Sequence, residues 1–97
     1  MIIRHKEIIE EFAKKHADIV VALQNWVSVV ELARWNSHND LKAMFPSADY
    51  VGNGRYVFNI KGNSYRMVVV VFFANGYLNV RFVGTHAEYD KINCTNI

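Results

Sequence analysis

The spacing of apolar residues changes in the middle of the chain, and this change limits the possible folds more than any other feature. Up to Pro46 the apolar residues recur at intervals of three and four, which is the period of an amphipathic helix. From Arg55 onward the period becomes two, which is typical of a strand with one buried face. Helices followed by strands predict an α+β fold, with the helices packed on one face of a small antiparallel sheet.

Three helices are predicted before the strands begin. The first covers Lys6–His16, and the second covers Asp18–Trp35, with Asp18 as its N-terminal cap. The third begins at Ser37, which has the spacing of an N-cap, and ends at Pro46, where residues 47–50 are predicted to form a turn. The apolar stripe of the second helix is predicted to be core and contains Ile19, Leu23, Trp26, Val27 and Val30.

Two turn signals, Gly62-Asn63 and Asn75-Gly76, divide the segment after Arg55 into three strands. A two-residue loop at each signal fixes the pairing of the strands and leaves one sheet face entirely apolar. The pairs expected in the first hairpin are Ile60 with Tyr65, Phe58 with Met67 and Tyr56 with Val69. Those expected in the second are Phe73 with Leu78, Val71 with Val80 and Val69 with Phe82.

Basic residues are concentrated in this strand segment. Between Tyr50 and Ala87 the sequence has four basic residues and no Asp or Glu, although the net charge of the whole protein is only +2. The predicted pairing places all four on the face opposite the apolar one. The expected rows of that face are Arg55, Val70 and Arg81 in one and Asn59, Arg66 and Thr85 in the other, with Lys61 and Ser64 beside the first turn.

This basic face has two interpretations. Clustered arginines favour a phosphate polymer such as an RNA backbone, because each guanidinium can bind two phosphate oxygens. The alternative is an ordinary solvated sheet surface that binds nothing in particular. The face also carries Val57, Val68, Val83 and Phe72, so part of it is expected to be covered by a helix or by a partner.

A short C-terminal helix is predicted directly after the last strand. Thr85 and Glu88 have the spacing of a capping box. The amides at the start of this helix are expected to point toward the row that contains Arg66 and to offer a phosphate seat. His86 can exchange a proton near neutral pH, and Tyr89, one turn further on, can donate a hydroxyl to the same space.

Length and composition restrict the class of protein. A chain of 97 residues with 52% hydrophobic content predicts one domain, covering residues 1–97. The single cysteine, Cys94, cannot form an internal disulfide and agrees with a reducing compartment. The four histidines have no metal-ligand spacing, so neither a metal nor another cofactor is expected. The N-terminus becomes charged at Arg4 and no apolar run spans a membrane, which predicts a cytoplasmic location.

Two strings in the second half of the chain carry a resemblance to a known family. The first string is Phe58-Asn59-Ile60-Lys61-Gly62-Asn63-Ser64-Tyr65-Arg66, and the second is Thr85-His86-Ala87-Glu88-Tyr89-Asp90. With these strings, and over nearly its whole length, the chain closely resembles the HigB toxins of bacterial type II toxin-antitoxin systems. The resemblance implies a RelE-like fold, in which a further strand around Met1 to Arg4 joins the sheet.

The resemblance also implies an activity and a set of partners. HigB toxins resemble small ribonucleases that enter the ribosomal A site and cut messenger RNA during translation, and a HigA-type antitoxin holds them inactive. The expected partners are therefore this antitoxin, the ribosome and messenger RNA, with no membrane. The expected cleavage uses the 2′-hydroxyl of the RNA as nucleophile and requires no metal.

Such a reaction divides the candidate catalytic residues by task. Arg66 and Arg81 are expected to stabilise the charge that develops on the phosphate. Lys61, His86 and Tyr89 are candidates for proton transfer, with Lys61 and His86 ranked nearly equal. The residues expected to bind RNA are Arg55, Asn59, Lys61, Arg66, Arg81 and Thr85.

Two alternative functions use the same sheet face without catalysis. One is a noncatalytic module whose basic face holds RNA or an acidic partner. The other is an interaction protein whose valines and phenylalanines dock a partner helix. A binding module leaves the ends of the RNA unchanged, whereas a nuclease creates new ones.

Overall fold

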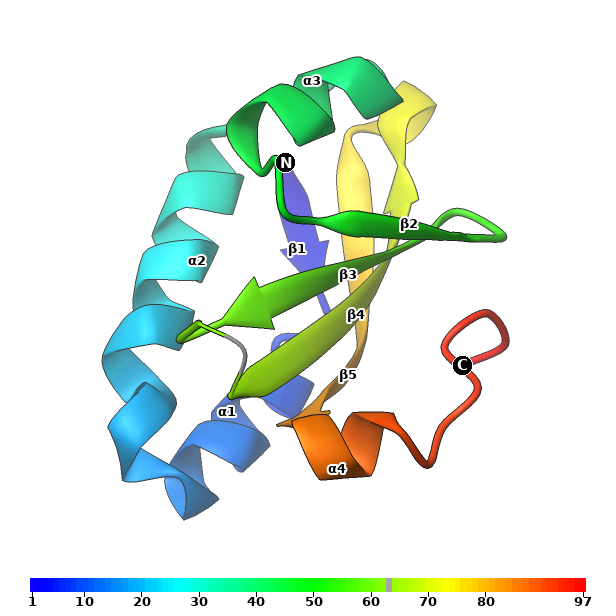
Figure 1. Cartoon of the computed structure of the whole chain (residues 1–97). Helices are drawn as coiled ribbons and strands as arrows, with labels where there is room; N and C mark the ends of the chain where they lie inside the picture. Colours follow the sequence, from blue (N-terminus) through cyan, green and yellow to red (C-terminus); the bar gives the residue numbers. More distant parts are fainter. Residues whose placement is uncertain (63) are drawn as a thin grey trace.

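The computed structural model describes residues 1–62 and 64–97. Its helices and strands follow the order expected for an α+β protein (Figure 1). The elements are β1 (Ile2–Arg4), α1 (Glu7–Lys15), the 3-10 turn η1 (Ala17–Ile19), α2 (Val20–Leu32), α3 (His38–Met44), β2 (Asp49–Gly52), β3 (Arg55–Ile60), β4 (Tyr65–Phe72), the 3-10 turn η2 (Phe73–Asn75), β5 (Tyr77–Thr85) and α4 (His86–Tyr89).

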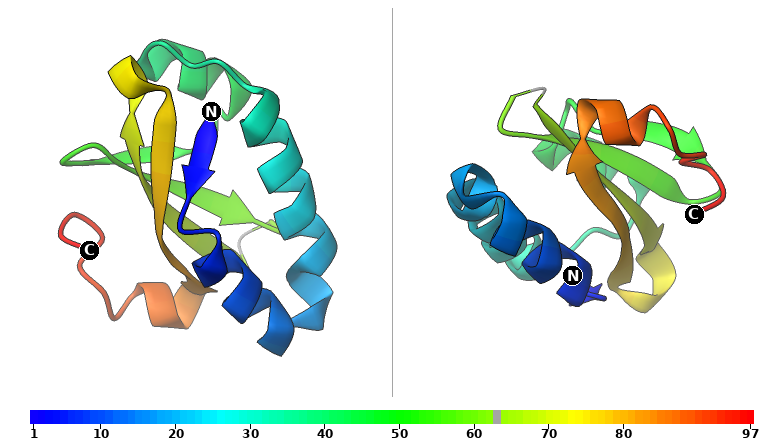
Figure 2. Two further views of the ribbon diagram at one scale, coloured as in Figure 1. Left: turned by 180° about the vertical axis from the view of Figure 1, so that it is seen from behind. Right: turned by 90° about the horizontal axis from the view of Figure 1, so that it is seen from below.

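The five strands form one mixed sheet in the order β1-β5-β4-β3-β2. β1 runs parallel to β5, and the other neighbouring strands are antiparallel. Helices α1 and α2 lie on one side of this sheet, whereas α4 and the C-terminal segment lie on the other (Figure 2). The sheet therefore separates a helix-covered face from a second face, which α4 and residues 90–97 cover in part.

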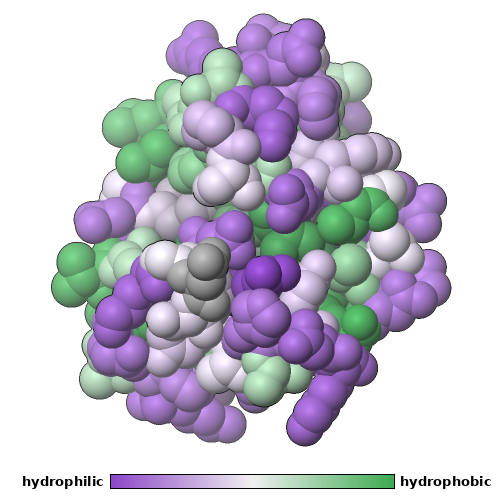
Figure 3. All heavy atoms as spheres, in the orientation of Figure 1, coloured by the Kyte–Doolittle hydropathy of each residue, from purple (hydrophilic) through white to green (hydrophobic). Residues whose placement is uncertain are grey.

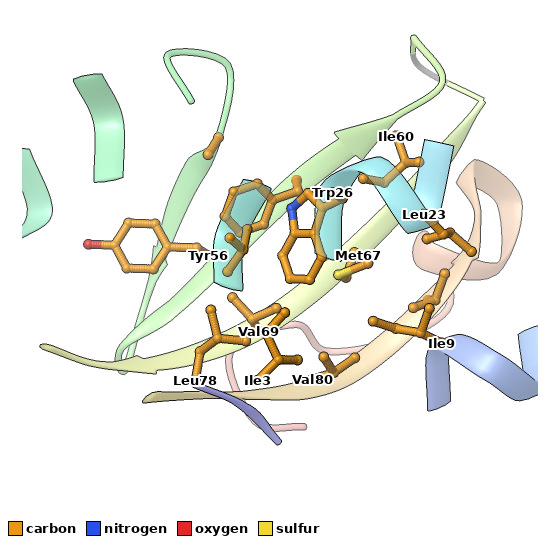
Figure 4. Packing of buried hydrophobic residues seen from close by; sticks show 14 of the residues in the cluster. Ile3, Ile9, Leu23, Trp26, Tyr56, Ile60, Met67, Val69, Leu78 and Val80 are labelled. Atoms are coloured by element: carbon orange, nitrogen blue, oxygen red, sulfur yellow. The ribbon is translucent and has the colours of Figure 1, made fainter. Parts of the chain in front are cut away.

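The helix-covered face holds the main hydrophobic core (Figure 4). The α2 residues Leu23, Trp26 and Val30 are buried against it, as the apolar stripe predicts. From the sheet side, β4 contributes Met67 and Val69, both completely buried. Since each fully buried apolar side chain of this size contributes about 1.5 to 3 kcal/mol, this face supplies most of the stability.

Helix α2 is apolar on its outer side as well. Val21, Val29 and Leu32 are exposed there, and apolar groups are visible along this side of the molecule (Figure 3). The helix ends at Leu32, three residues before the predicted break at Trp35. Trp35 is nevertheless buried, because the extended chain after α2 carries its ring into contact with Phe45.

Two of the three predicted helix starts need comment. Ser37 caps α3 as predicted, since its hydroxyl accepts a hydrogen bond from the Asp40 main chain. The prediction that Asp18 caps the second helix is wrong, because Asp18 lies inside η1 and α2 begins at Val20. The Asp18 carboxylate instead accepts hydrogen bonds from the Tyr65 hydroxyl at 2.9 Å and the Lys61 ammonium at 3.1 Å.

Strand β2 was not predicted from the sequence. Asp49 and Tyr50, which the pattern placed in a turn, pair with Val57 and Tyr56 at the edge of the sheet. The turn chemistry of the residues before them masked a strand only four residues long. The N-terminal strand expected from the family resemblance is present as β1.

The pairing of β3 with β4 is confirmed, whereas the predicted pairing of β4 with β5 is wrong. Phe58 opposes Met67 as expected, although Asn63 of the predicted loop lies outside the described residues. In the second hairpin Val71 opposes Leu78 instead of Val80. The reason is that η2 and Gly76, whose φ is positive at 74°, extend the connection beyond the predicted two residues.

A β-bulge in β5 changes the second hairpin further. Val69 opposes Val80 and Val68 opposes Phe82, so Arg81 is the extra residue of β5. Beyond this point the side chains of β5 exchange faces relative to the predicted register. Val83, which the pattern placed on the second face, therefore joins the helix-side core, and Phe82, which the pattern placed on the apolar face, lies on the second face.

Candidate active site

The centre of the second face is a pair of polar residues on neighbouring strands. Asn59 of β3 lies directly opposite Arg66 of β4, as the sequence predicted. The Arg66 Nε and the Asn59 Oδ1 are both buried, and neither has a hydrogen-bond partner among the described residues. A buried polar atom without a partner is costly, so this pair is suited to bind a polar ligand.

Across the sheet, the residue beside Arg66 is Gly84 and not Thr85. The predicted row that joined Asn59, Arg66 and Thr85 is therefore wrong at its third member. The longer connection through η2 and Gly76 shifts the pairing of β5 by two residues, and the bulge at Arg81 takes back one of them, so Gly84 lies beside Arg66. A side chain at position 84 would meet the ring of Phe82 at 2.4 Å, so the absence of a Cβ leaves room for that ring.

Helix α4 brings Tyr89 to the same place. The Arg66 guanidinium carbon lies 4.8 Å from the centre of the Tyr89 ring, in a cation–π contact. The Tyr89 hydroxyl donates a hydrogen bond to the Sγ of Cys94 at 3.4 Å. Burial raises the pKa of Tyr89, with a further contribution from Cys94, and the Arg66 charge opposes this shift. Tyr89 is thus a protonated phenol at neutral pH and can act as a proton donor.

The start of α4 is held by a complete capping box, as predicted. The Thr85 hydroxyl accepts from the Glu88 main chain, and the Glu88 carboxylate accepts from the Thr85 main chain at 2.8 Å. This main-chain hydrogen bond is the largest cause of the lowered pKa of Glu88. The His86 amide donates to the Ser64 carbonyl at 3.4 Å. The expectation of a phosphate seat made of free amides is therefore wrong for His86 and Glu88, whose amides already have acceptors.

His86 is positioned by a carboxylate on its own helix. Its Nδ1 lies 3.2 Å from the Asp90 Oδ2, one helical turn further on, and both side chains are about half exposed. Such a contact orients the imidazole and leaves Nε2 as the atom that can meet a substrate. The sequence identified His86 as a proton-transfer candidate but assigned Asp90 no definite role.

Arg55 lies on the second face and is held by the C-terminal segment. Its Nη2 and Nε donate to the main-chain oxygen of Ile97 at 2.7 and 3.1 Å, and its Nη1 donates to the Asn53 carbonyl at 2.8 Å. The Asn53 amide also donates to the Thr95 carbonyl. Residues 90–97, which form neither a helix nor a strand, thus cover part of this face, where the sequence predicted a helix or a partner. Arg55 opposes Val70, as predicted.

The remaining two basic residues do not lie where the pattern placed them. The Lys61 ammonium donates a hydrogen bond to the Asp18 carboxylate. The same carboxylate accepts from the Tyr65 hydroxyl at the edge of the helix-side core. The prediction that all four cations share one face is wrong for Lys61. Arg81 is exposed at the bulge of β5, and Asn79 occupies its predicted place opposite Val70.

Sequence reasoning missed three contributors to this site. Gly84 and Phe82 depend on the bulge, for which a strand pattern gives no signal. Cys94 was assigned no role, yet it contacts Tyr89. The two residues are five positions apart, and helical spacing predicts contacts only between residues three or four apart. Within residues 1–62 and 64–97, no group of three His, Cys, Asp or Glu side chains gathers in a way that suits a metal ion. The same residues include no helix with the length and apolar character needed to cross a bilayer.

The fold and the site together define a small α+β protein with helices on one face of its sheet and an arginine-centred polar site on the other. Residues 19–92 match the HigB_toxin family, which is described as the RelE-like toxic component of a toxin-antitoxin system. The chain belongs to this family. Membership implies an antitoxin as a partner.

Curated relatives cover most of the chain. The mRNA interferase toxin HigB of Escherichia coli K12 is 38% identical over 88 residues, which span 88% of this chain and 80% of the relative. The mRNA interferase HigB of Escherichia coli O6:H1 is 30% identical over 85 residues, which span 86% of this chain and 82% of that protein. An mRNA interferase HigB of Shigella flexneri is 38% identical over 88 residues.

Proposed function

We propose that this protein is an endoribonuclease toxin that cuts messenger RNA on the ribosome and thereby inhibits translation. The observation that carries the proposal is the Arg66 Nε, buried beside Asn59 on the second face of the sheet without a hydrogen-bond partner among the described residues, in a chain whose relatives are named mRNA interferases. The family supports an antitoxin partner, and we assign it to the HigA type. The proposed place of action is the cytoplasm, where ribosomes translate.

The proposed reaction is an in-line displacement at phosphorus. The 2′-oxygen forms a bond to the phosphorus and gives its proton to a base on the protein, while the bond to the 5′-oxygen of the next nucleotide breaks. That 5′-oxygen receives a proton from an acid on the protein. The products are a 2′,3′-cyclic phosphate and a 5′-hydroxyl end, and the protein must stabilise the extra negative charge on the phosphate in the transition state.

Arg66 is the proposed charge-stabilising residue. Its guanidinium is held in place by the Tyr89 ring, so it needs little rearrangement when the charge develops. Arg81 is the second candidate, and its exposed position at the bulge lets it approach a phosphate from the edge of the site. Arg binds phosphate oxygens through two parallel hydrogen bonds, which suits a trigonal-bipyramidal transition state.

His86 and Tyr89 are the proposed proton-transfer residues. His86 is oriented by Asp90, and Tyr89 stays protonated at neutral pH, which favours His86 as the base and Tyr89 as the acid. Lys61 is a weaker candidate than the sequence indicated, because it must first leave Asp18.

RNA binding is proposed to extend along the same face. Asn59 offers a side-chain carbonyl oxygen that has no partner among residues 1–62 and 64–97. Thr85 lies at the start of α4, although its hydroxyl already accepts the capping hydrogen bond. Arg55 can bind a phosphate if the phosphate displaces the main-chain oxygen of Ile97 as its hydrogen-bond acceptor. Because the net charge is only +2, the affinity depends on this local group of cations and should fall as salt increases.

The experiment that tests the proposal maps RNA ends. The purified protein is incubated with messenger RNA, with and without programmed ribosomes, in the presence of a chelator. We expect new 5′-hydroxyl ends only when ribosomes are present. Cuts in free RNA would show that the protein is a nuclease that does not require the ribosome. Intact RNA in both reactions would favour a noncatalytic binding module.

A further inference from the structure

An aromatic cavity lies away from the Arg66 site, between α3 and the β2 end of the sheet. It has a volume of about 540 Å³ and is lined by His38, Tyr50, Gly54, Tyr56, Val71 and Phe73. This volume is within the range of about 300 to 1,000 Å³ that is usual for small-molecule sites. Four of the six lining residues carry aromatic rings, so the cavity is suited to a flat ligand.

The rings around the cavity are in contact with one another. Tyr50 and Tyr56 lie side by side with ring centres 5.0 Å apart, and His38 lies 5.7 Å from Tyr56 and 6.0 Å from Tyr50. Phe73 closes the far side, 6.1 Å from Tyr56. Tyr56 extends from β3 at the margin of the core cluster (Figure 4). Tyr50 is 52% exposed and offers ring surface at the mouth of the cavity.

The cavity also contains a polar pair. The Tyr56 hydroxyl lies 2.7 Å from the Nδ1 of His38. Burial raises the pKa of Tyr56, so this hydroxyl keeps its proton at neutral pH. If Tyr56 donates to Nδ1, the His38 Nε2 carries a proton and can donate to an acceptor on a ligand. A ring for stacking and a donor at its edge are the two elements by which proteins recognise an unpaired base.

The chain connects this cavity to the proposed RNA face. Gly54 lines the cavity, and the next residue, Arg55, has its guanidinium on the second face of the sheet. Because Arg55 and Tyr56 are consecutive residues of β3, their side chains point to opposite sides of the strand. A nucleic acid that contacts Arg55 with a phosphate can therefore reach the cavity only around the edge of the sheet.

We propose that this aromatic cavity binds one unpaired base of an RNA strand, stacked on Tyr50 and hydrogen-bonded by His38. The inference rests on the proposed function, since it extends the RNA path beyond the Arg66 site. The base can belong to the messenger RNA or to ribosomal RNA. The recognition chemistry is the same in both cases. The two sources differ in which RNA the protein binds more weakly when the Tyr50 ring is removed.

The test compares three variants by direct binding. Tyr50→Ala removes the stacking ring, Tyr50→Phe keeps it, and Leu32→Ala is a matched control that removes an 86% exposed apolar side chain from α2. One arm measures the affinity for a short single-stranded RNA with 2′-O-methyl groups, which the proposed reaction cannot cut. The other arm measures the affinity for ribosomes without messenger RNA. Thermal unfolding of each variant confirms that it is folded.

We expect Tyr50→Ala to weaken binding about ten-fold in one arm, because base–aromatic stacking is worth about 1 to 3 kcal/mol per base. Loss in the oligonucleotide arm assigns the base to messenger RNA, and loss confined to the ribosome arm assigns it to ribosomal RNA. Tyr50→Phe and Leu32→Ala should bind like the unchanged protein. In the arm that weakens, titration with RNA should also shift the His38 ring signal in NMR spectra and leave that of His5 unchanged.

Equal affinity of Tyr50→Ala and the unchanged protein in both arms would overturn the inference. The affinity of the same variants for the antitoxin is measured as well, and a loss confined to the antitoxin would also overturn the inference and make the cavity a protein-binding site. These outcomes are separable from a failure of the proposed function, because neither arm requires cleavage. If the unchanged protein cuts RNA and Tyr50→Ala binds RNA with normal affinity, the proposed function stands and the proposed base site is wrong.

Discussion

Two consecutive residues of β4 point to opposite faces of the sheet, and these two faces differ in their surroundings. Met67 points into the helix-covered core and is completely buried among apolar side chains. Arg66 points to the second face, where its Nε is buried without a partner among the described residues. One strand thus supplies the packing that stabilises the fold and the charge that we assign to catalysis.

Within the part of the chain that the structure describes, the two faces also differ in the buried side-chain atoms that have no hydrogen-bond partner. On the helix side these atoms are the indole nitrogens of Trp26 and Trp35, which are neutral and cost little compared with a charge. On the second face they belong to the guanidinium of Arg66 and the amides of Asn59 and Asn79. An unpaired charged group is expensive, so the second face gains most from an anionic ligand.

The largest expected effect separates the two faces by function. Arg66→Ala should reduce RNA cleavage by about 10² to 10³-fold and abolish growth arrest, because a preorganised donor is lost from the transition state. Arg81→Ala should also abolish growth arrest. Both variants should remain soluble and bind the antitoxin, and Arg34→Ala, an exposed arginine beyond α2, is the control. If both variants remained fully toxic, the second face would not be the active face.

The neighbouring substitution tests the other face. Met67→Ala should lower the free energy of unfolding by about 2 to 5 kcal/mol, since it leaves a cavity in a fully packed core. At a temperature where the variant is folded, its cleavage rate should be close to that of the unchanged protein. Denaturant unfolding and single-turnover cleavage check the two statements. A stable but inactive Met67→Ala would show that the two faces are not separable.

A substitution at Gly84 should disturb the packing of the second face through one contact. Gly84→Ala places a methyl group 2.4 Å from the end of the Phe82 ring, beside Arg66. We expect the ring to move and the free energy of unfolding to fall by about 1 to 3 kcal/mol. Thermal unfolding measures the loss, and the double variant Phe82→Ala with Gly84→Ala should recover the part caused by the clash. An unchanged melting temperature for Gly84→Ala would contradict the packing.

The capping box of α4 should contribute a smaller amount. Thr85→Ala removes the hydroxyl that accepts from the Glu88 main chain and should cost about 1 kcal/mol. Thr85→Ser keeps the cap and serves as the control. Hydrogen exchange of the α4 amides checks this, with faster exchange in Thr85→Ala than in Thr85→Ser. Equal exchange in the two variants would show that α4 is held by its other contacts.

The smallest effect is a dependence of stability on pH. Hydrogen bonds from Tyr65 and then Lys61 lower the pKa of Asp18 below its ordinary value of 3.8. The folded pKa lies below the unfolded one, so the carboxylate stabilises the protein above about pH 4 and loses this contribution as the pH falls through the folded pKa. Asp18→Asn should therefore melt below the unchanged protein at pH 7, with the difference closing toward pH 3.

Asp49 offers a control for this measurement. It is an exposed carboxylate on β2, and Asp49→Asn should show no such difference between pH 7 and pH 3. A constant gap between Asp18→Asn and the unchanged protein over this range would mean that the hydrogen bonds do not depend on the Asp18 charge.

The sequence predicted the parts of the fold that depend on period. The apolar stripe of α2 and the pairing of Phe58 with Met67 follow from spacing alone, because burial permits only one register. The bulge at Arg81 and the longer connection through η2 left no signal, since both keep apolar residues on the core side. The errors in strand register are therefore local to β5 and the loop before it, whereas the Asp18 cap and the missed strand β2 are separate errors.

The candidate site was predictable to a similar extent. Arg66 and Asn59 share a row because β3 and β4 pair as expected, and Tyr89 follows from the capping box. The ion pair of Lys61 with Asp18 was not predictable, because it joins a turn to a distant segment of the chain. Long-range contacts of exposed charges depend on tertiary structure and have no local pattern.

The most direct test of the account is the single-turnover cleavage rate of Arg66→Ala on ribosomes programmed with messenger RNA, measured beside Arg66→Lys and the unchanged protein. We expect a loss of about 10² to 10³-fold for Arg66→Ala. We expect partial activity for Arg66→Lys, which keeps the charge but loses the two parallel hydrogen bonds. A rate for Arg66→Ala within about three-fold of the unchanged protein would contradict the central claim that the second face of the sheet performs the chemistry.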